Sequence, residues 1–202
     1  MRRPQLRVVG PSEAVDRPAL QRAFHQGDRE AFAQLVAPHM DLLYTHCLRM
    51  TGRPADAEDL TQEALVAALR EHRRYDPSRE FRPWLLVIAL NRCRDHLRSV
   101  WWRRVFSLEG LSLAHGRDVE RELLDADDDA RVRAALSTLP VTYREAVSLF
   151  HLEDLSYAEM SEITGQSVAA LKQRVRRGLA MLAKALARIH PDLVPALPLE
   201  EP

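Results

Sequence analysis

Apolar positions in the first half of the chain recur at helical spacing, the pattern of an amphipathic helix packed on a core. This pattern begins near Leu20, is divided at Pro38 and stops at Gly52, where glycine can end a helix. Pro54 suits the first turn of a further helix, which the pattern extends to about His72. The side chains expected to face the core from this helix are Leu60, Ala64, Ala67 and Ala68.

A short run of turn-forming residues, Tyr75–Arg79, separates these helices from the next one. Pro83 is predicted to open that helix, which continues to about Arg98. Trp84 lies on its apolar stripe, so packing in the core is favoured over a platform on which bases stack. Residues 20–102 are therefore predicted to form one compact, all-helical domain.

A second helical domain is predicted over residues 129–190. Its first helix reaches Leu139, and Pro140 opens the second. A short helix over 156–164 and a longer one over 167–188 follow.

The remaining segments lack helical periodicity. Residues 103–128 are rich in carboxylates and are predicted to be a flexible acidic linker. Residues 1–19 and 191–202 carry repeated prolines and are predicted to be tails. The predicted fold class is all-α, with two small helical domains joined by the linker.

Composition narrows the class of protein further. The chain has 202 residues, 46% of them hydrophobic, which is enough to bury real cores. Its two cysteines, Cys47 and Cys93, are too few for a disulfide framework and favour a reducing compartment. The start lacks an apolar stretch of signal-peptide length, and no run is long enough to span a membrane. We therefore expect a cytoplasmic protein.

A formal net charge of zero hides strong segregation of charge. Residues 70–104 hold ten arginines and four acids, whereas residues 105–130 hold two arginines and eight carboxylates. Residues 172–188 hold six basic residues and no acid. Two basic blocks with an acidic spacer predict two surfaces for a polyanion, although solvated helix faces are the plainer alternative.

The second basic block contains a helix-turn-helix pattern, SYAEMSEITGQSVAALKQRVRRGLAML, over residues 156–182. Ser156 and Glu159 match a capping box, Gly165 ends the short helix, and Ser167 can cap the next. In this motif the second helix enters the DNA major groove.

The faces of that second helix divide as DNA recognition requires. A stripe expected to be buried comprises Val168, Leu171, Val175, Leu179 and Leu182. Glutamine can read adenine and arginine or lysine can read guanine, while flanking arginines suit phosphates. The candidate DNA-binding residues are Ser167, Ala169, Lys172, Gln173, Arg174, Arg176 and Arg177. A helical hairpin with basic solvent-facing residues remains the alternative.

Both helical units resemble parts of one family. The C-terminal unit, with the preceding LSTLPVTYREAVSLFHLEDLSYAEMSEITGQS, is similar to region 4 of sigma-70 superfamily sigma factors. The N-terminal runs AEDLTQEALVAALR and FRPWLLVIALNRCRDHLR resemble region 2 of the same family. Because only two such domains and a short connector are present, the layout is similar to the extracytoplasmic-function (ECF) subfamily. The resemblance covers Leu20 to Arg188.

The resemblance implies a non-enzymatic subunit that directs RNA polymerase to the promoters of a specific regulon, such as a stress-response regulon. The implied partners are core RNA polymerase, through the clamp and flap of its large subunits, promoter DNA and an anti-sigma factor, with no cofactor. The implied polymerase-binding residues are Asp56, Glu58, Asp59, Gln62 and Glu63. Those implied for the −10 element, partly in the loop 75–82, are Ser78, Arg79, Arg82, Asn91, Arg92, Arg94 and Arg98.

Two departures from the family pattern stand out. The recognition helix reads AALKQR, so Gln173 is expected to alter which −35 sequence is read. Trp101 and Trp102 follow the first domain, where they could cap its core or contact a partner.

Parts of the sequence also suggest three other classes of function. An acid-base or metal site around Glu58, Asp59, Glu63 and His72 lacks a second motif to complete it, so no catalytic residue is assigned. A zinc site through His46-Cys47 and Cys93-x-x-His96 is disfavoured, because adjacent side chains point to different helix faces. A conventional helix-turn-helix regulator shares the C-terminal evidence, but it would not need core polymerase for specific promoter binding.

Overall fold

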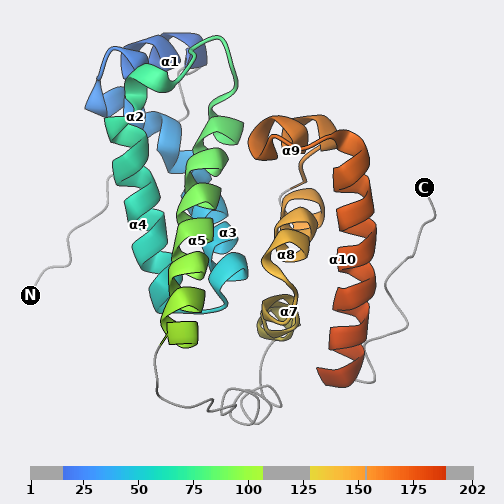
Figure 1. Cartoon of the computed structure of the whole chain (residues 1–202). Coiled ribbons are helices and arrows are strands. Elements are labelled where there is room, and N and C mark those ends of the chain that lie inside the picture. The colour runs from blue at the N-terminus through green and yellow to red at the C-terminus, as the bar shows by residue number, and fades with distance from the viewer. Residues whose placement is uncertain (1–15, 107–127, 153, 190–202) are drawn as a thin grey trace, which may run out of the picture.

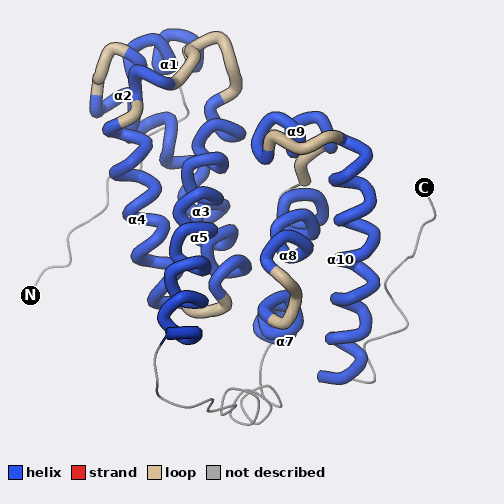
Figure 2. Tube along the Cα trace, in the orientation of Figure 1, coloured by secondary structure: helices blue, strands red, loops and turns tan. Residues whose placement is uncertain are grey.

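The computed structural model describes residues 16–106, 128–152 and 154–189, and every regular element within these ranges is a helix. Figure 2 shows the helices joined by short loops. The predicted acidic linker, apart from its helical ends, and most of both predicted tails lie outside the described residues.

The N-terminal domain begins with short, well-capped helices. Helix α1 spans Arg17–His25 and α2 spans Arg29–Val36. The carboxylate of Asp28 accepts hydrogen bonds from the backbone N–H groups of Glu30 and Ala31, at 2.8 and 3.1 Å, which fixes the start of α2. Pro38 lies in the 3-10 turn η1 (Ala37–His39), so α2 ends and α3 (Met40–Thr51) begins around it. Gly52 ends α3 with φ 75°, as the sequence predicts.

Three longer helices form the body of this domain. Helix α3 packs against α4 (Pro54–Arg70) and α5 (Phe81–Phe106), and the 3-10 turn η2 (His72–Arg74) leads out of α4. The expected inward face of α4 is buried, since Leu60, Ala64, Ala67 and Ala68 are all in the core. Small alanines on this face allow the helix backbones to approach closely.

An aromatic cluster joins α1 to the start of α5. Phe24 is fully buried at its centre, with ring centroids of Phe81 at 5.6 Å, Trp84 at 5.7 Å and Tyr75 at 5.7 Å. Trp84 is half-buried and packs against the core, which supports the packing interpretation of this residue. The cluster fixes the place at which the loop 75–80 leaves and rejoins the helices.

The C-terminal domain consists of α7 (Asp128–Ser137), α8 (Val141–Val147), the π-helical turn η3 (Ser148–Leu152), α9 (Tyr157–Thr164) and α10 (Val168–Ile189). Helix α10 packs along α8 and α7, and α9 crosses its N-terminal end (Figure 1). The sequence predicts the short and long helices of the motif to within one residue at each end, but it does not predict η3.

Gly178 allows α10 to approach α8 closely. A Cβ atom at this position would lie 2.6 Å from Cγ2 of Val147 and 3.1 Å from the backbone oxygen of Tyr143. Alanine normally stabilises a helix interior by up to ~1 kcal/mol relative to glycine. Here we expect the opposite sign: Gly178→Ala lowers the free energy of unfolding by ~1–3 kcal/mol, because the two helices must separate. Chemical denaturation of both proteins measures the difference, and a stabilised variant would contradict this close contact.

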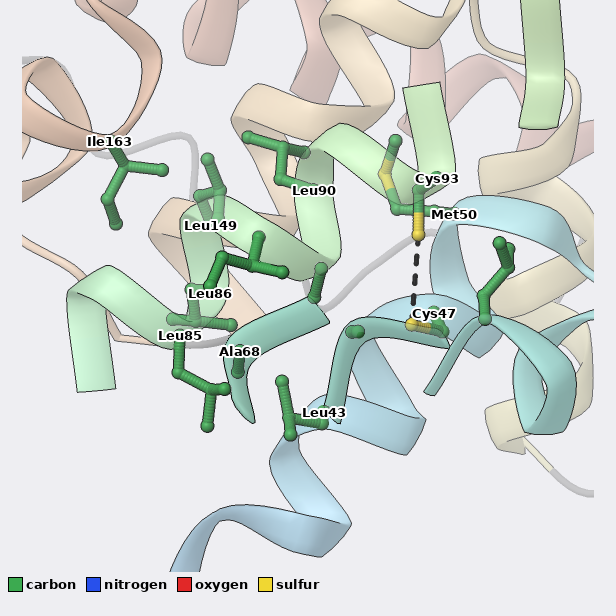
Figure 3. Close-up of a cluster of buried hydrophobic side chains, with 14 of the residues drawn as sticks. Leu43, Cys47, Met50, Ala68, Leu85, Leu86, Leu90, Cys93, Leu149 and Ile163 are labelled. Atoms are coloured by element: carbon green, nitrogen blue, oxygen red, sulfur yellow. Dashed lines mark hydrogen bonds between the residues drawn. The ribbon is translucent and has the colours of Figure 1, made fainter. Parts of the chain in front are cut away.

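The two domains lie side by side and share a large hydrophobic cluster (Figure 1). A smaller, separate cluster lies within the C-terminal domain and comprises Ala135, Leu136, Leu139, Val147 and Leu182. Buried residues of α3, α4 and α5 belong to the same cluster as Leu149, Met160 and Ile163 of the C-terminal domain. Figure 3 shows Leu149 and Ile163 beside Leu86 and Leu90 of α5. The sequence predicts the two domains but does not indicate that they dock on each other.

Several element boundaries differ from expectation. Helix α1 begins at Arg17, inside the segment predicted as a tail, because Asp16 caps it and Pro18 suits its first turn. Helix α5 begins at Phe81 and continues to Phe106, past the predicted start of the linker at residue 103. The prediction that Val168 is buried is wrong, because its side chain is 40% exposed.

Candidate nucleic-acid and protein interfaces

Helix α10 presents a continuous polar face to solvent. Leu171 and Val175 on its inner face are 1% and 3% exposed, and they anchor the helix in the core. The outward positions are all exposed, with Arg174 half-buried beside them; the exposed set comprises Ser167, Ala169, Lys172, Gln173, Arg176 and Arg177. The structure therefore places the predicted DNA-reading residues together on one accessible surface.

The turn before α10 is built from local hydrogen bonds. Both halves of the capping box are present at the start of α9, with Ser156 and Glu159 bonded reciprocally. Hydrogen bonds from the Ser156 hydroxyl and N–H, more than the nearby charge of Arg82, hold the pKa of Glu159 below its usual value. Gly165 ends α9 with φ 70°, and Ser167 caps α10 by accepting from the N–H of Ala170 at 3.3 Å. These bonds fix the orientation of the outward face of α10.

The loop before α5 is ordered by side chains that bond back to the loop itself. Asp76 accepts from the N–H and hydroxyl of Ser78, at 2.9 and 2.7 Å, and these bonds lower the pKa of its carboxyl. The Tyr75 hydroxyl donates to the carbonyl of Arg79 at 2.6 Å, and burial raises the Tyr75 pKa to about 12. Ser78 and Arg79 are exposed at the tip of this loop.

An open pocket lies beside this loop. It is lined by residues from α1, α2, η1 and the start of α5, among them Arg17, Gln21, His39, Phe81 and Arg82. Burial, together with the charges of Arg82 and Arg17, lowers the pKa of His39, so that ring favours its neutral form. The lining of the pocket combines apolar side chains with two arginines, Arg17 and Arg82, and one acid, Glu80.

The predicted −10 residues of α5 divide between two faces. Asn91, Arg94 and Arg98 recur at helical spacing on one face, and Arg94 lies 3.4 Å from the Asn91 side-chain oxygen. The exposed Arg98 pairs with Asp95 at 2.8 Å. Arg92 lies apart from them, in a shallow groove shared with α4. The structure therefore brings Arg92 to the predicted polymerase-binding side instead.

That groove contains most of the predicted polymerase-binding residues. Asp59, Gln62 and Glu63 are exposed on one face of α4, next to Val66, which is 49% exposed. Glu58 is also exposed. Asp56 differs, because its carboxylate is half-buried and lies 3.6 Å from Nε2 of His96 on α5 and 3.6 Å from Nε of Arg53.

Other residues noted in the sequence are now placed. Cys47 and Cys93 are fully buried in the core, with their sulfur atoms 3.7 Å apart (Figure 3). Among the described residues, no group of three or more potential ligands is arranged to hold a metal ion. Trp101 and Trp102 are 56% and 47% exposed and meet edge to face at 4.9 Å, so they do not cap the core.

Sequence reasoning missed two charged residues that the structure makes prominent. Arg144 and Glu145, on α8, are only 6% and 5% exposed. They lie within an apolar helix pattern. Charged residues are rarely buried unless they are paired, so their position there indicates a buried polar contact. The sequence alone does not identify the residues that they contact, because both contact residues of the other domain.

Two family profiles match the chain in this order. Sigma-70 region 2 matches residues 35–103, which include α3, α4 and most of α5. Sigma-70 region 4 matches residues 129–182, which include the helix-turn-helix. The chain belongs to the sigma-70 family, in the ECF group of RNA polymerase sigma factors.

Named relatives agree with this assignment. The sigma factor is 32% identical over 171 residues to ECF RNA polymerase sigma factor SigW of Bacillus subtilis, across 80% of this chain and 91% of SigW. It is 34% identical over 173 residues to RNA polymerase sigma factor CnrH of Cupriavidus metallidurans, across 79% of this chain and 88% of CnrH. A solved structure of CnrH in complex with the cytosolic domain of CnrY matches with a TM-score of 0.63 and 30% identity, covering 85% of this chain and 97% of that one.

Family membership settles the class of function. Sigma factors are transcription initiation factors that bind core RNA polymerase and promoter DNA, so this chain is not an enzyme. The conventional-regulator alternative is excluded by the region 2 match. In the described part of the sigma factor, none of the helices has the length and apolar character needed to cross a membrane.

Proposed function

We propose that three surfaces of the sigma factor divide the work of promoter recognition. The exposed face of α4 docks on the clamp of core polymerase, the loop 75–82 with α5 engages the opened −10 element, and α10 reads the −35 element. The geometry of α10 carries this proposal. Its inner face is buried in the core, the turn before it is fixed by the capping box and Gly165, and its candidate base-reading residues are exposed. The sigma factor acts by binding energy alone.

The −10 assignment rests on a pocket next to a basic helix. An unpaired base from the non-template strand can enter the pocket between α1 and the loop 75–82, as base-extruding proteins accommodate a flipped base. Arg79 and Arg82 then neutralise phosphates next to that base, and Arg94 and Arg98 of α5 follow the strand. Ser78 donates to Asp76 in the free protein, so it holds the loop in shape.

We further propose that the sigma factor works in the cytoplasm and is held inactive by an anti-sigma factor. CnrH, at 30% identity, is solved in complex with the cytosolic domain of CnrY, and a partner of this kind would cover surfaces that otherwise meet polymerase or DNA. The exposed aromatic pair Trp101-Trp102 offers such a partner apolar area at the end of α5.

Transcription in vitro tests the function as a whole. Purified core RNA polymerase, with and without the sigma factor, transcribes sheared genomic DNA of the host, and the 5′ ends of the products are mapped. We expect discrete new transcripts whose upstream regions share two spaced elements. An absence of transcripts that depend on the added protein would refute the proposal.

Reversing charge on α4 is expected to weaken polymerase docking. Asp59→Lys with Glu63→Lys should lower the affinity for core polymerase by about tenfold or more, because an acidic face then becomes basic. Both side chains are exposed, so the melting temperature should change little. Asp41→Lys, an exposed acid on α3, is the matched control. A fluorescence titration measures the affinity for core polymerase. Equal affinity of the wild type, the double variant and Asp41→Lys would exclude this face as the docking surface.

Arg176→Ala separates base reading from phosphate binding. If Arg176 reads a base, the loss should be ~1–3 kcal/mol at one −35 position and small elsewhere. The reconstituted holoenzyme is titrated with promoters in which each −35 base pair is replaced in turn. Arg188→Ala, on the same helix beyond the motif, serves as the control. An equal loss on every promoter would make Arg176 a phosphate contact.

A further inference from the structure

Two stacked aromatic rings lie beside one of the candidate reading residues of α10. The rings of Phe150 and Tyr157 are nearly parallel, with centroids 4.3 Å apart and an interplanar angle of 21°. The ammonium group of Lys172 lies over the Tyr157 ring, 5.7 Å from its centroid. A cation over the face of an aromatic ring, within about 6 Å of the centroid, is attracted by the ring. Tyr157 on α9 therefore contacts a reading residue on α10.

Local structure fixes the position of the Tyr157 ring. Tyr157 is the first residue of α9 and directly follows Ser156, which forms the capping box with Glu159. Phe150 belongs to the π-helical turn η3, so this turn places the ring against which Tyr157 stacks. Both rings are half-buried and pack against the core. The stack is a firm support for the exposed side chain of Lys172.

Lys172 has few other contacts that could hold it in one position. Within residues 16–106, 128–152 and 154–189, its ammonium group forms no ion pair. The exposed residue one turn further along α10 is Arg176, which carries the same charge and repels it. A lysine side chain has many rotamers, so fixing it when DNA binds costs conformational entropy. The Tyr157 ring lowers that cost, because it holds Lys172 before DNA arrives.

The Tyr157 ring attracts Lys172 as a neutral aromatic group. Burial raises the pKa of the Tyr157 phenol, so the hydroxyl stays protonated at neutral pH. The attraction therefore comes from the face of the ring and not from a phenolate charge. Phenylalanine at this position would keep that face, whereas leucine would keep apolar volume without it. These two substitutions separate the ring from its hydroxyl and from simple packing.

We propose that Tyr157 is a positioning residue of the −35 reading surface, which holds Lys172 for contact with a guanine. This inference rests on the proposed function of α10. Lysine can read O6 and N7 of guanine in the major groove, and the place of its ammonium group decides which base it reaches. Tyr157 acts through Lys172, so a residue outside the recognition helix contributes to base preference.

Selective labelling of lysine observes the contact itself. The chain has only two lysines, Lys172 and Lys184, and both are exposed on α10. Labelling the full-length protein with ¹³C-lysine gives two ε-methylene NMR signals, which Lys184→Arg assigns. We expect the ring current of Tyr157 to shift the Lys172 signal upfield of the Lys184 signal, and Tyr157→Leu to remove that shift. Coincident signals in the wild type would overturn the proposal.

A double-mutant cycle tests whether the contact affects base reading. Holoenzyme reconstituted with each variant is titrated with a promoter identified as above, in which each −35 base pair is replaced in turn. Lys172→Met should lose discrimination at one position by about fivefold or more. Tyr157→Leu should lose about two- to fivefold at that position, because the ring is gone, and Tyr157→Phe should lose none. With Lys172→Met already present, Tyr157→Leu should cause no further loss there.

Tyr143→Leu is the matched control for this cycle. Tyr143 is also a half-buried tyrosine of region 4, but it packs against the smaller hydrophobic cluster of that domain. The variant should therefore keep discrimination at every −35 position. Circular dichroism of each variant shows whether it is folded, and the wild-type lysine spectrum tests the contact even where Tyr157→Leu is unstable.

The titrations distinguish failure of this inference from failure of the proposed function. Three results would overturn the positioning role: an even loss over all promoters, the same loss with and without Lys172, or the same loss in Tyr157→Phe. An even loss caused by Lys172→Met would make Lys172 a phosphate contact and would also overturn it. A wild-type holoenzyme that binds every one of these promoters equally would instead count against the proposed function of α10.

Discussion

Arg144→Ala is expected to lower the free energy of unfolding by about 3–5 kcal/mol, because its guanidinium donates to three backbone carbonyls. The guanidinium is buried, and burial lowers its pKa. Removing it leaves the buried carbonyls of Met50 and Leu139 without this donor, together with the part-buried bond to the carbonyl of Ser137. Each buried acceptor left unsatisfied costs about 1–3 kcal/mol.

Thermal unfolding followed by circular dichroism measures this effect. A chain of this length should lose roughly 6–20 °C in melting temperature. Arg144→Lys keeps the charge but cannot bond three carbonyls at once, so its loss should be intermediate. Arg188→Ala removes an exposed arginine of the same domain and should change stability by less than about 1 kcal/mol. Equal melting temperatures for Arg144→Ala and Arg188→Ala would contradict a stabilising role for these hydrogen bonds.

Phe24→Ala is expected to cost about 3–5 kcal/mol of stability, because it removes the centre of the aromatic cluster. Phe24 is fully buried, and its ring meets Phe32 at 5.2 Å as well as Tyr75, Phe81 and Trp84. Some of this cost is cavity formation, so Phe24→Leu should lose less. Since Tyr75 and Phe81 border the loop 75–80, loosening the cluster also loosens the −10 surface.

Two readouts separate these effects. Chemical denaturation gives the stability loss, with the partly exposed Met181→Ala as a surface control near ~0.5 kcal/mol. Promoter opening by folded Phe24→Leu holoenzyme should be reduced, while its binding to isolated −35 duplex should be unchanged. Loss of −35 binding to the same degree would show that the cluster does not act through the loop.

Local features of the fold were predictable because local chemistry determines them. Pro38, Gly52 and Gly165 mark helix ends where the structure has them, since each restricts or permits a specific backbone conformation. The capping box at Ser156 predicts the start of α9, because its hydrogen bonds involve only residues close in sequence. The outward face of α10 follows from helical periodicity, because the opposite face is apolar.

Features that depend on contacts between distant residues were not predictable in this way. The basic residues of α5 are visible in the sequence, but Arg94 meets Glu145 and Arg92 lies beside α4 only because of how the helices pack. Val168 fits the apolar period, yet it is 40% exposed, because periodicity alone does not show which positions of a face are covered by a neighbour. The docking of the two domains leaves no mark in the helical periodicity of either domain. The sequence therefore predicts the two domains but not the contact between them.

We expect the sigma factor to bring core polymerase to a promoter and to open the −10 element. Permanganate reactivity of thymines measures this directly on a promoter recovered from the transcription experiment. We predict reactive non-template thymines around −10 only when core polymerase and the sigma factor are both present. Specific binding of the sigma factor to the whole promoter without polymerase, and no reactive thymines when polymerase is added, would contradict the account.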